Sequence, residues 1–523
     1  MFRVLVADKI NQEGLAPLAS SPEIEWVQEK IENVSDLDSY DALLVRSATK
    51  VTAEVIKKMS SLKIIARAGV GVDNIDLEAA TKRGIIVVNA PTGNTISTAE
   101  HTFAMMMTLT RKICQANQSL KSGHWERGAF QGTELRGKTL GVIGFGRIGA
   151  EIAKRAKVFG MVVLTYDPFL TKDKAKKLGI KPVELDRLLA DSQIITVHTP
   201  LTEETRGLLN MESLKKTKPG VMLINCARGG IIDENALLHY LQTGHVAGAA
   251  LDVFADEPPQ NLDLIQMEQV VVTPHIAAST KEAQLNVACI VAEEILNFAQ
   301  GKPVQNSVNL PAISKETWQK IGPYYELTKT MGRIISQLTK RPVKSLEIIY
   351  SGEICSMETS PITRGLLAGF LQPKVDFVVN DVNAPNLAKE YGISFGETHP
   401  DTDFLYTNHV KVIVSTDQEP FTLEGTYIKT YGARIVNIDG FDVDFTPEGN
   451  VLVVEYTDRP GVIGSMGRVL GSHGINIGAM QVGRKKEGGQ ALMILTTDKP
   501  VSPRVAEEMA AVEKIDRIVN IEF

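Results

Sequence analysis

The sequence predicts an α/β protein that begins with two doubly wound parallel-sheet domains and ends with two smaller α+β domains. Three observations lead to this prediction. Short apolar runs alternate with helical stretches twice in succession, which is typical of strands buried on both faces of a parallel sheet. The pattern changes near Pro311, and the last 73 residues show the βαββαβ order of a ferredoxin-like fold.

The first alternation occupies residues 1–95 and the second occupies residues 96–285. In the first, apolar runs lie at 2–8, 23–27, 41–47, 63–69 and 85–90, with helical patterns at 51–59 and 75–84. In the second, apolar runs lie at 139–144, 161–167, 194–200, 221–227, 246–254 and 270–275. Two long helices are expected to link the domains, one from about Ser97 to Gly123 and one from about Ser279 to Gly301. The second of them would return the chain to the first domain through residues 286–310.

The C-terminal half divides into residues 311–450 and 451–523. The first part combines helical patterns at 317–338 and 362–372 with strand patterns at 344–350, 409–416 and 421–428, and it carries no chemical motif. The second part has strand patterns at 451–456, 475–483, 491–497 and 515–523, and helical patterns at 461–473 and 502–512. At the start of its first helix, Asp458 is expected to cap the helix and Pro460 to occupy the first turn.

The composition excludes several classes of protein. Lys and Arg number 56 against 62 Asp and Glu, so the net charge is −6 and a broad nucleic-acid surface is not expected. No apolar run approaches the roughly 18 residues that span a bilayer, and the N-terminus reads as a strand, not as a signal peptide. The four cysteines fit neither a metal-binding spacing nor a disulfide framework. We therefore expect a cytoplasmic protein that binds no metal, membrane or nucleic acid.

A glycine-rich loop, GFGRIG, directly follows the predicted strand at 139–144 and begins an amphipathic helix. Gly144 allows a tight turn, Gly146 lets the backbone approach a pyrophosphate, and Gly149 lets the helix pack on the strand. The next strand ends at Asp167, whose carboxylate would accept hydrogen bonds from ribose hydroxyls and repel a 2′-phosphate. The pattern predicts a domain that binds NAD in preference to NADP. A structural glycine turn with a surface Asp is the alternative.

Three polar motifs lie at the ends of later strands in the same domain: Arg228, then Asp252 with Glu257, then His275. In open α/β sheets, ligands bind beyond the carboxyl ends of the strands, so these loops are expected to share an edge with the glycine loop. His275 could take the proton that leaves a 2-hydroxy acid during hydride transfer, with Glu257 orienting the imidazole. Arg228 could hold a carboxylate through two hydrogen bonds. Taken singly, each residue has a structural alternative, such as a loop His beside a Pro.

The motifs ARGGIID, DVFADEPP and TPHIAAST, with GFGRIG upstream, resemble those of the D-isomer-specific 2-hydroxyacid dehydrogenases. The segment VEYTDRPGVIGSMGRVLGSHGINI resembles an ACT regulatory domain. The resemblance extends over essentially the whole chain. It implies a Rossmann-type NAD domain inserted in a flavodoxin-like substrate domain, followed by an intervening domain and an ACT domain. It also implies NAD-dependent oxidation of 3-phospho-D-glycerate to 3-phosphohydroxypyruvate, the entry step of L-serine synthesis, with His275 as acid and base, Glu257 as its partner and Arg228 orienting the substrate.

Further site residues follow from the resemblance alone. The positions that match cofactor contacts are Gly144, Gly146, Arg147, Ile148, Gly149, Asp167, Thr199, Cys226, Ala227, Arg228, Asp252, His275 and Ala278. The positions that match substrate contacts are Arg46, Ser47, Gly69, Val70, Gly71, Asn94 and Arg127. Because the chain is net negative, an anionic substrate needs a local cluster of cations, for which Arg46, Lys50, Arg67, Arg127 and Arg228 are candidates.

The C-terminal domain has no candidate acid–base pair, so we interpret it as a binding module. The resemblance implies that Tyr456, Asp458 and Asn476 bind an amino-acid effector, L-serine, where two ACT domains pair side by side. With a second contact between NAD domains, the expected assembly is a homotetramer. A capping residue and a turn Asn are the structural alternative for Asp458 and Asn476.

Two other functions stay open from the sequence. The first is a dehydrogenase of another D-2-hydroxy acid, such as hydroxypyruvate or 2-hydroxyglutarate. The second is a dinucleotide-sensing corepressor on the same fold, although such proteins lack an ACT tail.

Overall fold

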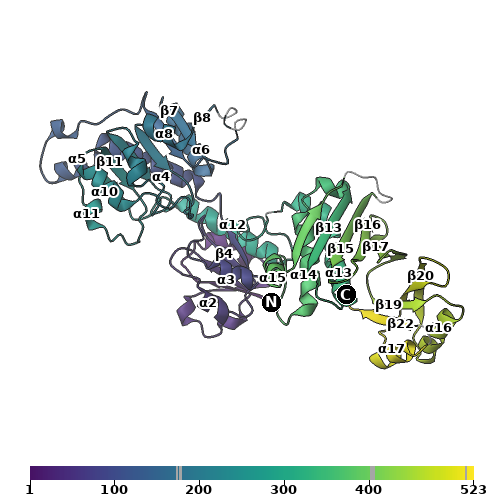
Figure 1. Cartoon of the computed structure of the whole chain (residues 1–523). Coiled ribbons are helices and arrows are strands. Elements are labelled where there is room, and N and C mark those ends of the chain that lie inside the picture. Colours follow the sequence, from purple (N-terminus) through teal and green to yellow (C-terminus); the bar gives the residue numbers. More distant parts are fainter. Residues whose placement is uncertain (172–174, 176–178, 312, 401–406, 513–514) are drawn as a thin grey trace.

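The computed structural model describes residues 1–171, 175, 179–311, 313–400, 407–512 and 515–523. Figure 1 shows an elongated molecule in which four bodies follow one another, with the N-terminal domain between the second domain and the C-terminal half. The predicted fold class is confirmed: two parallel sheets are followed by a mixed sheet and an antiparallel sheet. Among the described residues, no helix is both long enough and apolar enough to cross a membrane.

The first domain is built on a five-stranded parallel sheet in the order β2-β1-β3-β4-β5, which is the flavodoxin-like order. Its strands are β1 (Phe2–Val6), β2 (Ile24–Gln28), β3 (Ala42–Val45), β4 (Ile64–Arg67) and β5 (Ile86–Asn89). Its helices are α1 (Ala16–Ala19), α2 (Ala53–Lys58) and α3 (Leu77–Lys82), and α12 (Lys281–Ala299) packs on the same sheet. The apolar side of α12 buries Val287, Val291 and Ile295 in the core on this face of the sheet, where the helix contacts β4 and β5, so the chain closes its first domain with a helix from far along the sequence.

The second domain is built on a seven-stranded parallel sheet in the order β12-β11-β10-β9-β6-β7-β8. Its strands are β6 (Thr139–Ile143), β7 (Val162–Tyr166), β8 (Lys181–Pro182), β9 (Ile194–Val197), β10 (Val221–Asn225), β11 (Val246–Leu251) and β12 (Val270–Val272). Its helices include α6 (Arg147–Val158), α8 (Leu185–Asp191), α9 (Met211–Lys215), α10 (Glu234–Gln242) and α11 (Leu262–Ile265). The strand order reverses between β6 and β9, which creates a crevice at their carboxyl ends. The two-residue edge strand β8 was not predicted.

The helix predicted from Ser97 to Gly123 is two helices, α4 (Thr95–Arg111) and α5 (Ile113–Lys121). They are separated by Lys112, whose backbone adopts the left-handed conformation with φ 50°. The reason lies in packing. Helix α4 buries eight residues, whereas α5 buries none, so core packing does not favour one straight helix beyond Lys112.

The intervening domain has a six-stranded mixed sheet in the order β14-β13-β15-β16-β17-β18. Its strands are β13 (Ser345–Gly352), β14 (Ser394–Thr398), β15 (Asn408–Ser415), β16 (Phe421–Ile428), β17 (Gly432–Ile438) and β18 (Phe441–Phe445). Its helices are α13 (Lys315–Leu338), α14 (Ser360–Leu371) and α15 (Ala384–Glu390). Helices α13 and α14 pack backbone to backbone, because a Cβ at Gly332 or Gly369 would collide with the facing main chain.

The C-terminal domain has the predicted ferredoxin-like fold, with sheet order β20-β21-β19-β22. Its elements are β19 (Asn450–Thr457), α16 (Val462–Ser472), β20 (Ile477–Arg484), β21 (Gln490–Thr497), α17 (Pro503–Ala510) and β22 (Ile515–Ile521). The capping prediction for Asp458 is wrong. Helix α16 begins after Gly461, which has φ 97° and no side-chain cap, so Pro460 lies outside the helix. The carboxylate of Asp458 lies instead 3.3 Å from Arg484 Nη1, because strand β20 brings that cation beside it.

The two faces of the C-terminal sheet belong to different cores. One face, with Leu452 and Val454, packs under α16 and α17. The other face, with Val451, Val453 and Ile494, joins the hydrophobic core of the intervening domain. The two C-terminal domains therefore share a core and do not behave as separate lobes.

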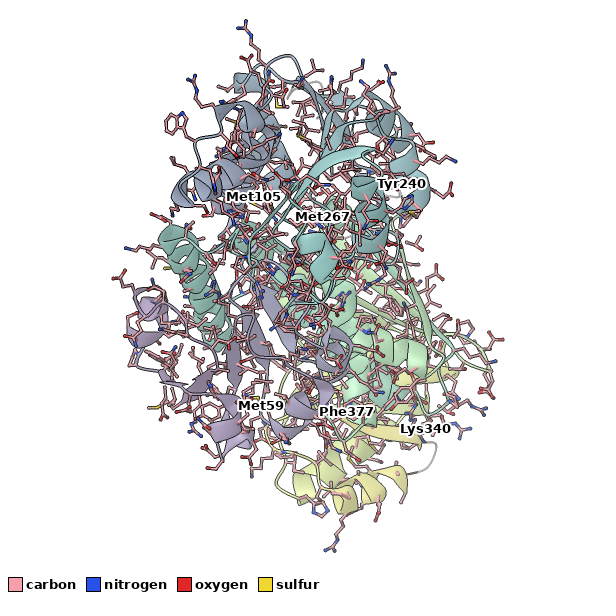
Figure 2. All side chains as sticks on the ribbon, turned by 90° about the vertical axis from the view of Figure 1, so that its left-hand side faces the viewer. Met59, Met105, Tyr240, Met267, Lys340 and Phe377 are labelled. Carbon is pink, nitrogen blue, oxygen red and sulfur yellow. The ribbon has the colours of Figure 1, made fainter. Side chains whose placement is uncertain are left out.

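The intervening domain also contacts the first domain. The side-chain amide of Asn380 donates to the carbonyl of Gly84, at 2.7 Å. Beside this bond, a pocket of about 520 Å³ separates α3 from α15, and Phe377 is one of its lining residues. Figure 2 shows Phe377 at this boundary, below the second domain that holds Met105 and Met267.

Candidate active site between the two parallel-sheet domains

The glycine loop joins β6 to α6 in the way that a dinucleotide site requires. Gly144 has φ 89°, and a Cβ there would lie 2.7 Å from the carbonyl of His198. Gly149 lies so close to the carbonyl of Gly144 that a Cβ would collide with it, whereas the space in front of Gly146 is open. The loop therefore has room for a phosphate at the N-terminus of α6, where backbone N–H groups favour an anion.

Asp167 follows β7 and lies against this loop. Its Oδ2 accepts a hydrogen bond from the N–H of Phe145 at 2.7 Å, and its Oδ1 accepts one from the N–H of Phe169 at 2.8 Å. These bonds hold a negative charge beside the glycine turn.

The opposite wall of the crevice is formed by the residues after β9. Burial lowers the pKa of His198 to about 3, so its imidazole is neutral, and its Nε2 lies 2.7 Å from the hydroxyl of Thr196. The hydroxyl of Thr199 is buried and has no hydrogen-bond partner within the described part of the chain. Its methyl group lies close to Gly144, so this unpaired hydroxyl stands beside the glycine loop, where a bound dinucleotide would lie. The residues present thus fit NAD.

The other residues predicted to contact the cofactor lie along the same edge of the sheet. Arg147 and Ile148 form the first turn of α6, Cys226 and Ala227 follow β10, and Ala278 follows the His275 loop. The Cys226 side chain packs in the core, and burial raises the pKa of its thiol to about 12, so it is an uncharged packing group.

His275 and Glu257 form the predicted pair. The Nδ1 atom of His275 lies 2.7 Å from Oε2 of Glu257, and the other carboxylate oxygen accepts a hydrogen bond from the N–H of Phe254 at 3.3 Å. Because a carboxylate only accepts hydrogen bonds, Nδ1 carries the proton and Nε2 is left as the acceptor. The His275 side chain is 48% exposed, so Nε2 can reach a ligand.

Asp252 anchors the loop that carries His275. It is fully buried at the end of β11, and its Oδ1 accepts from the hydroxyl of Thr273 at 2.5 Å and the N–H of Ile276 at 2.9 Å. Its Oδ2 accepts from the N–H of Ala277 at 2.9 Å. Since both oxygens are engaged, Asp252 holds the His275 loop in place.

Sequence reasoning missed two residues of this anchor, His101 and Thr273. His101 on α4 lies 3.3 Å from Oδ1 of Asp252. Burial alone would raise the pKa of Asp252, but the hydrogen bonds from His101, Thr273 and the loop N–H groups hold it below its usual value. Thr273 stands two residues before His275 in the same strand-end motif, so the sequence could have indicated it as a polar residue of this loop. His101 is visible only in the fold, because α4 is remote in sequence.

Arg228 reaches from the second domain to the first. Its Nε lies 2.9 Å from Oδ2 of Asp73, and its guanidinium covers Gly71, where a Cβ would collide with it. Its Nη1 donates to the carbonyl of Ala227. The predicted substrate glycines and the predicted substrate Arg therefore meet across the boundary between the domains.

Arg67, at the end of β4, adds a second cation to this place. Its guanidinium lies over Gly69, and burial, reinforced by repulsion from Arg228, lowers its pKa to about 10. Arg67 therefore stays charged at neutral pH. Its Nε is buried and has no partner among the described residues. Because Arg46 also lies close enough to lower this pKa, three cations gather where an anion would relieve their repulsion.

Three predicted substrate residues of the first domain remain to be placed. Ser47 is exposed after β3, Val70 lies in the glycine turn, and Asn94 precedes α4 with its Oδ1 buried and unpaired within the described chain. Among described residues, no group of three or more His, Cys, Asp or Glu side chains is arranged to hold a metal ion.

Comparison with known proteins agrees with this geometry. Residues 103–277 match the D-isomer specific 2-hydroxyacid dehydrogenase NAD binding domain, residues 320–439 match the D-3-phosphoglycerate dehydrogenase intervening domain, and residues 450–514 match the ACT domain. The chain is 55% identical over 524 residues to the D-3-phosphoglycerate dehydrogenase of Bacillus subtilis, with all of both chains covered. The chain belongs to the D-3-phosphoglycerate dehydrogenase family.

Two further relatives extend the comparison. The D-3-phosphoglycerate dehydrogenase of Archaeoglobus fulgidus is 46% identical over 529 residues, covering 100% of this chain and 99% of the relative. The crystal structure of D-lactate dehydrogenase from Aquifex aeolicus, complexed with NAD and lactic acid, is 32% identical with a TM-score of 0.54. It covers 59% of this chain and 100% of its own, so the part it matches is found elsewhere as a separate folded chain.

Arg127 is not brought to the cation cluster within one chain. It lies on an exposed 3-10 turn (Arg127–Phe130), which contacts Lys112 at the end of α4. The first turn of α4 lies at the carboxyl edge of the second sheet, where Ser97 bonds Thr280. Because α4 has 17 residues and a helix rises about 1.5 Å per residue, Arg127 lies about 25 Å from the first turn of α4, at the opposite edge of the second sheet.

The predicted effector residues are also divided in this member of the D-3-phosphoglycerate dehydrogenase family. Tyr456 is buried, and its hydroxyl has no partner in the described chain, close to Asp458 and Arg484. Asn476 lies beyond the opposite end of the sheet. On strand β21, Thr457 pairs with Gln490 at one end and Ile477 pairs with Thr497 at the other. These ends are seven residues apart, which is about 23 Å at about 3.3 Å per residue.

Proposed function

We propose that this protein oxidises 3-phospho-D-glycerate to 3-phosphohydroxypyruvate with NAD. The observation that carries the proposal is the meeting of Arg228 with Asp73 and Gly71, beside Arg67 and Arg46. A substrate with a carboxylate at one end and a phosphate at the other needs cations at both ends. The names of the full-length relatives agree with this substrate.

The residues of the chain divide the reaction between them. Nε2 of His275 accepts the proton of the 2-hydroxyl group, and Glu257 stabilises the imidazolium that results. Arg228 orients the substrate carboxylate, and Arg67 and Arg46 provide charge for the phosphate. The bound NAD supplies the acceptor for the hydride that leaves C2. The Asp252 anchor keeps the His275 loop fixed while the proton moves.

We propose that L-serine regulates this activity at the C-terminal domain and that the protein forms a homotetramer. Within one chain, Asn476 lies about 23 Å from the Tyr456 and Asp458 end of the sheet, so an effector could contact all three only between two copies. Arg127 likewise could reach a substrate phosphate only in the site of a second copy. These separations support an assembly of several chains.

The test is NADH formation from 3-phospho-D-glycerate and NAD by the full-length protein, with and without L-serine. We expect turnover that serine reduces. Turnover with hydroxypyruvate or 2-hydroxyglutarate as the better substrate would contradict the assigned substrate. Turnover that serine leaves unchanged would contradict the assigned regulation and keep the reaction.

The cofactor preference gives a separate prediction. Asp167→Asn keeps one carbonyl oxygen for the N–H of Phe145 but removes the charge that would repel a 2′-phosphate. We expect kcat/KM for NADP relative to NAD to rise about tenfold, which corresponds to about 1.4 kcal/mol. Steady-state rates with both cofactors measure this ratio, and an unchanged ratio would show that Asp167 does not select the cofactor.

A further inference from the structure

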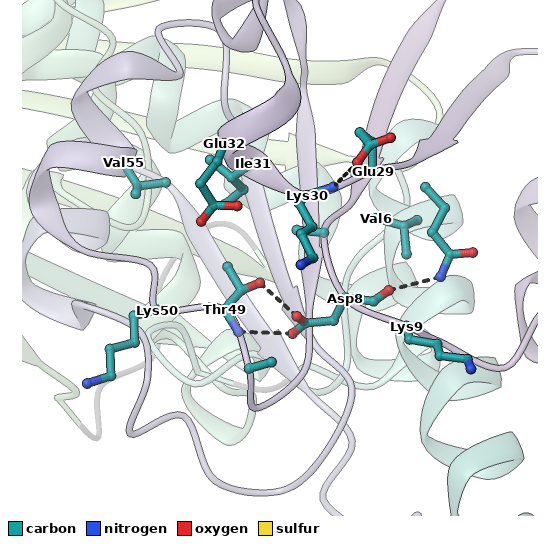
Figure 3. Close-up of a pocket in the computed structure, with 13 residues that line it drawn as sticks. Val6, Asp8, Lys9, Glu29, Lys30, Ile31, Glu32, Thr49, Lys50 and Val55 are labelled. Carbon is teal, nitrogen blue, oxygen red and sulfur yellow. Dashed lines mark hydrogen bonds between the residues drawn. The ribbon is translucent and has the colours of Figure 1, made fainter.

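The loop that follows β3 carries two predicted substrate residues, Arg46 and Ser47. On one side, its backbone is held by Asp8, at the end of β1. Oδ2 of Asp8 accepts from the N–H of Arg46 at 2.5 Å and from the N–H of Thr49 at 3.3 Å, and Oδ1 accepts from the Thr49 hydroxyl at 2.7 Å. Figure 3 shows the two bonds between Asp8 and Thr49.

On the other side, the same loop is held by Asn74. Its side-chain nitrogen donates to the carbonyl of Arg46 at 2.8 Å and to the carbonyl of Thr49 at 2.6 Å. Asp8 thus satisfies the N–H groups of these two loop residues, and Asn74 satisfies their carbonyl groups. The residue before Asn74 is Asp73, which forms the ion pair with Arg228 across the domain boundary.

Packing does not hold the loop on the side of Asp8. A pocket of about 720 Å³ lies there, at the carboxyl ends of β1, β2 and β3, and Asp8, Ala48, Thr49 and Lys50 are among its lining residues. Figure 3 shows the Asp8 carboxylate and the ammonium of Lys30 facing this space. Because open space replaces packed side chains, hydrogen bonds set the position of the loop.

We propose that Asp8 and Asn74 are positioning residues for substrate binding. They fix the loop from which Arg46 and Ser47 approach the substrate, and Asn74 ties that loop to the Asp73–Arg228 pair. Asp8 itself is 9% exposed and touches the substrate loop only through backbone groups and the Thr49 side chain. The inference rests on the proposed function, because it assigns a task to Arg46.

The first test compares Asp8→Ala with wild type in the full-length enzyme. We expect KM for 3-phospho-D-glycerate to rise at least tenfold, while the Kd for NADH stays within twofold. Asp8→Asn should restore most of the affinity, since its carbonyl can accept both N–H groups and its amide can donate to the Thr49 hydroxyl. Asp76→Ala is the matched control, because Asp76 also holds a backbone N–H group in this domain, that of Ala79, but lies outside the loop.

The second test asks whether Asp8 acts through Arg46. In the double variant Asp8→Ala with Arg46→Ala, we expect the KM increase to fall well below the product of the two single increases, since a misplaced loop cannot lose Arg46 twice and only the Ser47 contact is left to lose. Multiplied effects would overturn the proposal. So would an Asp8→Ala enzyme with unchanged KM, or one with NADH affinity reduced as much as substrate affinity. Asn74→Ala should reproduce the KM increase, and it replaces Asp8→Ala if that variant fails to fold.

The failure of the proposed function is distinguishable from the failure of this inference. Wild-type enzyme without 3-phospho-D-glycerate turnover would contradict the function. Hydrogen exchange then still tests whether Asp8 holds the loop. The amides of Arg46 and Thr49 should exchange at least tenfold faster in Asp8→Ala than in wild type, with the amides of strand β3 unchanged. Unchanged exchange at these two amides would overturn the positioning role.

Discussion

His275→Ala is expected to reduce turnover about 10³-fold, which corresponds to about 4 kcal/mol of transition-state stabilisation. The imidazole pairs with Glu257 through Nδ1, which leaves Nε2 as the proton acceptor, and the side chain is half exposed. The glycine loop and Asp167 lie elsewhere on the sheet edge, so NAD binding should stay intact. Single-turnover rates and NADH binding, measured on the same preparation, separate these two quantities.

Two variants control this experiment. Glu257→Gln keeps a hydrogen-bond acceptor beside Nδ1 but removes the charge that stabilises the imidazolium, so it should lose less turnover than His275→Ala. His239→Ala changes an exposed His on α10 and should leave turnover unchanged. Near-normal turnover of His275→Ala would remove His275 from the proposed mechanism.

Deleting residues 451–523 is expected to destabilise the intervening domain by several kcal/mol. Val451, Val453, Leu492, Ile494 and Ile521 are buried in the core that both C-terminal domains share. Burial of each such side chain stabilises by about 1.5–3 kcal/mol, and the facing apolar groups of the intervening domain lose their cover as well. Thermal unfolding should show an earlier transition or aggregation.

A deletion after residue 310 is the matched comparison for this experiment. It removes both C-terminal domains together, so the core that they share is removed as a whole and is not left half exposed. It also keeps Asn309, whose side chain bonds the carbonyl of Ile85. The solved D-lactate dehydrogenase, which covers 59% of this chain and 100% of its own, supports its independent folding. If the variant without residues 451–523 has the same thermal unfolding transition as the full-length protein, the two C-terminal domains do not depend on one another. Effects on serine response are therefore better measured with Asp458→Ala than with a truncation.

Prediction from the sequence succeeded where local pattern and chemistry coincide. The strand, glycine turn and helix around Gly144 form one contiguous segment, so their spacing alone describes the turn. The strands of the intervening domain were found only in part: β14, β17 and β18 were missed. Each is short or mixed in burial, because this sheet has one face on the core and edges near solvent, which weakens the apolar pattern.

Two errors have a tertiary cause. Asp458 precedes a helix in a sequence typical of a cap, but Arg484 on another strand takes its carboxylate. The long helix after Ser97 has continuous helical propensity, but it breaks at Lys112, where packing against the sheet ends. In the first case a contact distant in sequence outweighs a local preference of about 1 kcal/mol, and in the second the packing that would keep one straight helix is missing.

The sequence by itself determined the fold class, the order of the domains and the identity of the chemical groups, because strand and helix periodicity and the motif spacings are local properties of the chain. Only the tertiary structure decided which groups meet. It joined Arg228 to Asp73, set Asp8 and Asn74 on opposite sides of the Arg46 loop, and placed Arg127 at the far edge of the second sheet. It also merged the cores of the two C-terminal domains. These pairings depend on the strand order and on the angle between domains, which arise from the burial of apolar surface over the whole chain and leave no mark in any single segment.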